Sequence, residues 1–130
     1  MTFFTREQYE RLIHNGTLKD HDPQPVVKLH LEGTDCVWLL TELNPNDPMI
    51  AFGLCDLGLQ SPELGYVDLS ELASLKLPFN NTVQPDEDFI GLYPISVYAA
   101  AARECGAITE DQEILRQFLF PRKSPGLRPV

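Results

Sequence analysis

The middle of this sequence contains no positive charge. Between Leu29 and Leu75 there is neither a lysine nor an arginine, although the 130 residues of the chain include ten. The same span holds eight carboxylates, and the formal net charge of the chain is −9. Because phosphates attract cationic side chains and repel carboxylates, this balance argues against direct binding of nucleic acid. A charged partner is expected to be a protein with a basic surface.

Long apolar runs and a secretory signal are also missing. No stretch approaches the roughly 20 apolar residues that cross a bilayer, and the N-terminus has no basic segment leading into an apolar one. We therefore expect a cytoplasmic protein that does not bind membranes. The length favours a single domain over residues 1–120, followed by a mobile C-terminal tail over residues 121–130.

Motifs that carry catalytic or metal chemistry do not occur. Cys36, Cys55 and Cys105 are far apart and form no Cys-x-x-Cys pair, and the three histidines have no metal-ligand spacing. The sequence has no Gly-x-Ser-x-Gly elbow and no glycine motif for binding phosphate. We therefore predict no catalytic residue, no metal and no cofactor.

Hydrophobic patterning predicts an α+β fold. Thr5 and Gln8 have the capping-box spacing in front of an N-terminal helix that ends near Gly16. Four apolar or alternating segments follow, and their short Gly- and Pro-rich connections favour an antiparallel meander of about four to five strands. These strands are expected at residues 26–32, 36–43, 49–56 and 64–69.

Further helices are predicted after the strands. Asp68 and Glu71 have the spacing of an N-cap and the third helical residue, ahead of a short helical turn. Pro94 opens an alanine-rich helix, and Thr109 with Gln112 repeats the capping-box spacing before a final amphipathic one. We expect the N-terminal helix and the two C-terminal helices to pack mainly on one face of the sheet.

Five carboxylates are the candidate partner-binding residues: Asp56, Glu63, Asp68, Glu71 and Glu42, which ends an otherwise apolar strand. The first four lack the spacing of a calcium-binding loop, so a metal cage is disfavoured. A negative face kept only for solubility is the simplest alternative. The binding hypothesis requires these side chains to stay exposed on the exterior of the sheet rather than gathering in a shielded cleft.

A set of short motifs runs through the middle of the chain. They are Trp38 with Thr41-Glu42, Phe52-Gly53-Leu54, Pro62-Glu63-Leu64-Gly65-Tyr66, Leu69-Ser70-Glu71-Leu72 and Pro78-Phe79. Over most of residues 5–106 this pattern resembles a family of small uncharacterised bacterial proteins, a domain of unknown function common on plasmids and other mobile elements. The resemblance implies no activity and no site residues. It implies a setting in which proteins that counter host defence or regulate DNA maintenance are common.

The function we predict is that of a non-enzymatic, acidic interaction or regulatory protein. Its partner would be a protein with a basic surface, such as a nucleic-acid-handling or host-defence protein in a mobile-element setting. Two alternatives stay open. One is a small metal-dependent hydrolase or nuclease that uses carboxylates, and the other is a scaffold or oligomer-forming domain.

Overall fold

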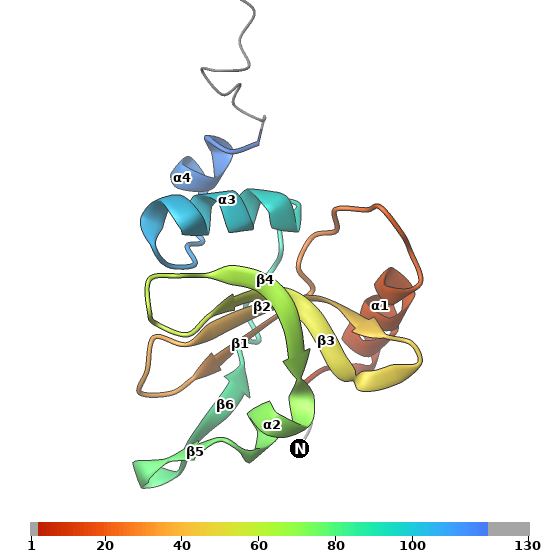
Figure 1. Ribbon diagram of the computed structural model, residues 1–130, viewed down its shortest axis with the longest axis vertical. Helices are drawn as coiled ribbons and strands as arrows, with labels where there is room; N and C mark the ends of the chain where they lie inside the picture. Colours follow the sequence, from red (N-terminus) through yellow and green to blue (C-terminus); the bar gives the residue numbers. More distant parts are fainter. Residues whose placement is uncertain (1–2, 120–130) are drawn as a thin grey trace, which may run out of the picture.

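A curled antiparallel sheet lies between two groups of helices in the computed structural model, which describes residues 3–119 (Figure 1). The α+β class predicted from the sequence is therefore confirmed. In chain order the elements are α1 (Arg6–Gly16), β1 (Val27–Leu31), β2 (Val37–Asn44), β3 (Asp47–Asp56), β4 (Glu63–Asp68), α2 (Leu69–Ser74), β5 (Lys76–Leu77), a 3₁₀ turn (Pro78–Asn80), β6 (Asn81–Pro85), α3 (Ile95–Cys105) and α4 (Gln112–Arg116).

The first helix begins where its cap predicts. The Gln8 N–H donates to the Thr5 hydroxyl at 3.1 Å, and the Thr5 N–H donates to the Gln8 side chain at 2.8 Å. This reciprocal pair satisfies two main-chain donors that the helix would otherwise leave free. At the other end Gly16 lies against β2, where a Cβ atom would come within 1.9 Å of the Leu43 carbonyl oxygen.

The sheet has six strands in the order β4-β3-β2-β1-β6-β5. Strands β1 to β4 form the predicted meander, because each pairs antiparallel with the next along the chain. After β4 the chain passes through α2 to the opposite edge of the sheet, where β6 pairs with β1 and β5 pairs with β6. The prediction of four to five strands missed this last hairpin, in which β5 is only two residues long.

The helices cover both faces of the sheet, so the expectation that they pack mainly on one face was wrong. Trp38 and Leu40 of β2 belong to a core that also contains residues of α1 and α2. Leu39 points the opposite way, into a second core with residues of α3 and α4. Because neighbouring side chains of a strand alternate between faces, an apolar run such as β2 needs cover on both sides.

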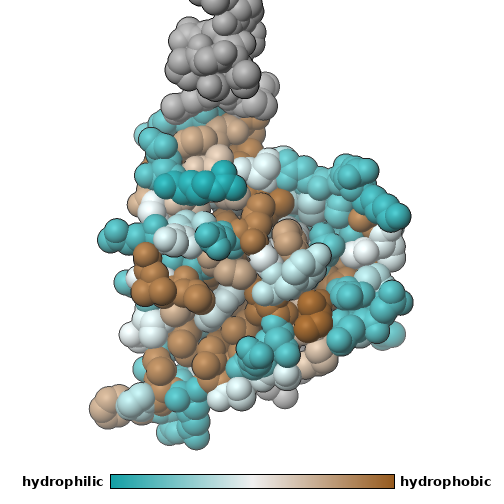
Figure 2. All heavy atoms as spheres, in the orientation of Figure 1, coloured by the Kyte–Doolittle hydropathy of each residue, from teal (hydrophilic) through white to brown (hydrophobic). Residues whose placement is uncertain are grey.

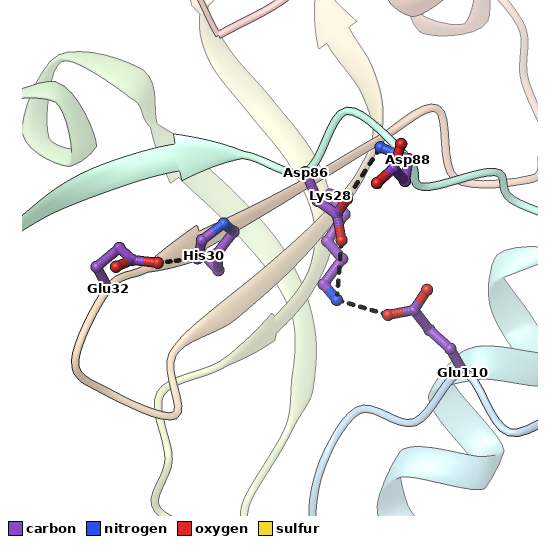
Figure 3. A network of polar contacts seen from close by, with 6 residues as sticks. All are labelled: Lys28, His30, Glu32, Asp86, Asp88 and Glu110. Carbon is purple, nitrogen blue, oxygen red and sulfur yellow. Dashed lines mark hydrogen bonds and ion pairs between the residues drawn. The ribbon is translucent and has the colours of Figure 1, made fainter.

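Polar contacts fix α3 and α4 to the sheet. Lys28 of β1 lies between two carboxylates, with its Nζ 2.5 Å from Glu110 Oε2 and 3.4 Å from Asp86 Oδ2 (Figure 3). Burial by itself would lower the pKa of Lys28, but the hydrogen bond and charge of Glu110, helped by Asp86, raise it above its usual value. The charged lysine therefore joins β1 to the connection between α3 and α4.

Two further predictions from the sequence concern membrane spans and the extent of the domain. Within residues 3–119, no helix is both long and apolar enough to span a bilayer. The predicted division into a domain over residues 1–120 and a mobile tail over residues 121–130 stays a prediction, because the tail lies outside the described residues.

Candidate protein-binding surface

The structure separates the five candidate carboxylates into different environments. Asp56, the last residue of β3, is only 2% exposed. Its Oδ1 accepts the Gly58 N–H at 2.9 Å, and its Oδ2 accepts the Ile108 N–H at 3.0 Å. The expectation that all five carboxylates face solvent is therefore wrong for Asp56, which joins the end of β3 to the segment between α3 and α4.

Glu42 is also removed from the open surface. It lies inside β2 rather than at its end, beyond an irregularity in the pairing with β3. Its Oε1 is 3.9 Å from His21 Nε2, and both side chains are less than one-third exposed. That ring nitrogen is buried and has no hydrogen-bond partner within residues 3–119.

The other three carboxylates lie on β4 and α2. Asp68 caps α2, because its Oδ1 accepts hydrogen bonds from the Ser70 N–H at 2.9 Å and from the Ser70 hydroxyl at 2.6 Å. The same two bonds hold the pKa of Asp68 below its usual value. Glu71 follows in the first turn of α2 and is exposed, as is Glu63 at the start of β4.

An apolar groove lies beside Asp68 and Glu71, between β4 and α2, and has a volume of about 330 Å³. We call it the β4–α2 groove. Asp68 and Glu71 are among its lining residues, and no lysine or arginine within residues 3–119 lines it. Figure 2 shows apolar side chains, in brown, scattered among polar ones over the face that carries β4 and α2. The apolar lining includes Trp38, Leu57, Val67, Leu72 and Leu75.

Tyr66 is the most exposed large hydrophobic residue of β4, with 77% of its surface open. Its ring nevertheless has a fixed neighbour, because it meets the ring of Phe52 edge-to-face with centroids 5.1 Å apart. Sequence reasoning missed Tyr66, Leu57 and Leu75 as surface residues. An apolar side chain in a strand or helix is assigned to the core by its pattern, and nothing in the sequence marks the ones left outside.

Two other features bear on the catalytic alternative. A wider hollow of about 610 Å³ contains Asp56, Asp35 and Cys105, but the Asp56 oxygens already accept main-chain hydrogen bonds. Across the described part of the chain, no three His, Cys, Asp or Glu side chains come together in a way that could hold a metal ion. In the β4–α2 groove, by contrast, exposed apolar surface lies together with the carboxylates of Asp68 and Glu71.

Comparison with known proteins gives one match. Residues 3–109 fit a family model whose description is "Protein of unknown function (DUF2958)". No curated protein and no solved structure is significantly similar to the chain.

Proposed function

The chain belongs to the DUF2958 family, and we propose that it is a non-enzymatic protein-binding module whose β4–α2 groove takes up a basic segment of a partner protein. One observation carries this proposal. Solvent-accessible apolar surface occurs together with Asp68 and Glu71 in a groove that no lysine or arginine of the described residues lines, and the exposed Glu63 begins the adjoining strand β4. Apolar contact supplies affinity in such an interface, and complementary charge selects the partner and speeds the encounter.

The class of partner follows from the charge. All 19 carboxylates lie within residues 3–119, which contain only seven of the ten lysines and arginines. A field of this sign repels nucleic acid but attracts the basic surfaces with which proteins hold nucleic acid. We therefore propose a nucleic-acid-handling or host-defence protein as partner. We also propose that the protein acts in the cytoplasm and that its gene is carried on a mobile element.

Charge reversal at the groove tests this function. The probe is a fluorescent peptide of about eight residues in which lysine and valine alternate, long enough to form a strand. We expect the double variant Glu63→Lys, Glu71→Lys to bind it about tenfold more weakly, because each reversal replaces an attraction by a repulsion. Fluorescence anisotropy at low and at physiological salt measures the dissociation constants.

The matched control has the same net charge. Glu10 on α1 and Glu104 on α3 are exposed and lie on other elements, so Glu10→Lys, Glu104→Lys alters the overall field but not the groove. This control is expected to bind within about threefold of the wild type at physiological salt. Equal weakening of the two double variants would mean that only net charge matters, and would overturn the proposal. Failure of the wild type to bind the peptide would do the same.

A further inference from the structure

Strand β4 forms one edge of the sheet, and its outer side has no partner. It pairs with β3 only, and within residues 3–119 no other main-chain group bonds to its outer edge. In an antiparallel ladder every second residue directs both its N–H and its C=O outward. Every second residue of the six in β4 therefore presents an unpaired donor and acceptor beside the β4–α2 groove.

The usual protection of an edge strand is missing from β4. Proteins block such edges with lysine, proline or a bulge inside the strand, or keep the strand very short. Strand β4 has neither lysine nor proline, and its charged residues, Glu63 and Asp68, are at its two ends. The opposite edge differs, because β5 has only two residues and one of them is Lys76.

From this edge we infer how the partner binds: an extended segment with alternating basic and apolar residues adds to the sheet as a further strand beside β4. This inference rests on the proposed function and specifies its mode of binding. Main-chain hydrogen bonds to β4 would supply affinity, and alternate side chains would reach the two faces of the sheet. One set would contact the β4–α2 groove, and the other would lie near Tyr66.

Charge decides between a foreign segment and a second copy of this chain. If β4 paired antiparallel with β4 of another copy along its full length, Glu63 of each copy would face Asp68 of the other. Like charges directly opposite each other destabilise a strand pair. A basic strand reverses the sign of both contacts, so these carboxylates disfavour self-pairing and favour a lysine- or arginine-bearing partner.

Two features of β4 suit an added strand. At Gly65, in the middle of β4, a Cβ atom would have no neighbour within 4 Å, so space is open for a side chain of the partner. Tyr66 offers an exposed aromatic face held in place by Phe52, and a lysine or arginine of the partner can stack on it.

Peptide methylation separates this mode from simple charge attraction. Two derivatives of the alternating lysine–valine peptide are made, one methylated on every lysine main-chain nitrogen and one on every valine main-chain nitrogen. Both keep all their positive charges. In an extended strand, alternate N–H groups point to opposite edges, so in the alternating peptide either the lysine or the valine N–H groups face β4. Methylation of that set removes the hydrogen bonds to β4, and methylation of the other set leaves them intact. We expect the derivative that loses these bonds to bind the wild-type protein about tenfold more weakly than the other derivative.

Hydrogen exchange gives a second measurement on the same samples. The outward amides of β4 are expected to exchange about tenfold more slowly when the unmethylated peptide is bound, while the β5 amides stay unchanged. Equal affinities of the two methylated peptides, or no protection of β4, would overturn strand addition. The proposed function would then survive if Glu63→Lys, Glu71→Lys still weakened binding, and would fail with it if the unmethylated peptide did not bind.

Discussion

The neighbouring strands β3 and β4 share two sequence features, a glycine and a terminal aspartate, but differ in their position in the sheet. Each contains a glycine, Gly53 and Gly65, and these two residues face each other across the ladder. Each strand also ends on an aspartate whose Oδ1 accepts the main-chain N–H of the residue two places later. Strand β3 has β2 on its other side, whereas β4 has no paired strand there among the described residues. The two strands therefore show how the same residue types behave in an inner strand and in an edge strand.

The aspartate at the end of β3 makes a long-range tertiary contact, whereas, in the described part of the chain, the aspartate at the end of β4 does not. Asp56 of β3 is buried, and Ile108, far away in the sequence, donates a second N–H to its carboxylate. Within residues 3–119, Asp68 of β4 accepts hydrogen bonds only from neighbours in the sequence, chiefly Ser70, and stays partly exposed. A negative charge without long-range partners is available to a ligand, so the binding surface that we propose follows β4.

The two glycines give the largest expected contrast. In Gly53→Ala the new Cβ would be 2.0 Å from the Leu39 carbonyl oxygen, so the main chain of β2 or β3 must shift. We expect the free energy of unfolding to fall by about 3 kcal/mol or more. In Gly65→Ala the Cβ meets nothing within 4 Å, and the change should stay within about 0.5 kcal/mol.

Urea unfolding followed by tryptophan fluorescence measures both variants. The chain has a single tryptophan, Trp38, which is buried beneath the β4–α2 groove and reports on the sheet. Similar losses in Gly53→Ala and Gly65→Ala would contradict the packing described for the two strands.

The two aspartates give the next contrast. In Asp56→Asn the amide can serve only one of the two main-chain donors and turns its own NH₂ toward the other, so we expect a loss of about 2 kcal/mol. In Asp68→Asn the loss should be below about 0.5 kcal/mol, because asparagine caps a helix about as well as aspartate. Equal losses, measured by thermal or urea unfolding, would mean that Asp68 has a buried partner as well.

Solvent access to the two strands can be compared with thiol chemistry. Burial raises the pKa of Cys55 in β3 to about 11, so little reactive thiolate forms near neutrality. A β4 thiol is introduced by Tyr66→Cys with Cys55→Ser, and both proteins carry Cys36→Ser and Cys105→Ser. At pH 8 we expect iodoacetamide to modify the β4 thiol at least about tenfold faster than Cys55, as followed by mass spectrometry. Equal rates would show that β3 is as open as β4.

Local patterns predicted the parts of this fold that depend on neighbours in the sequence. The capping box at Thr5 placed α1, and short turns between alternating segments gave the meander from β1 to β4. The hairpin of β5 and β6 escaped, because two residues give no periodicity and Asn81–Pro85 is mostly polar. Here pairing with β1, and not propensity, makes the strand.

The candidate site was predictable to a smaller extent. The sequence showed that acidic residues cluster without cations, and Glu63, Asp68 and Glu71 lie together on β4 and α2 as exposed or partly exposed groups. It could not distinguish Asp56 from Asp68, since both precede a loop or helix and make the same local bond. The Ile108 N–H that donates to Asp56 is 52 residues away in the sequence, so only the tertiary fold brings the two groups together.

The smallest expected effect concerns the titration of Asp68. Its bonds from the Ser70 hydroxyl and N–H hold its folded-state pKa below the usual value of 3.8. A carboxylate with a lowered pKa contributes stability above its unfolded pKa, and that contribution disappears as the pH falls through the folded value. Carbon-13 NMR should find the pKa of Asp68 below 3.8 in the wild type and closer to 3.8 in Ser70→Ala, which removes the hydroxyl donor but keeps the N–H. An unchanged pKa in Ser70→Ala would mean that the hydroxyl bond is not what stabilises the charge of Asp68, and that the main-chain N–H groups of Ser70 and Glu71 are sufficient.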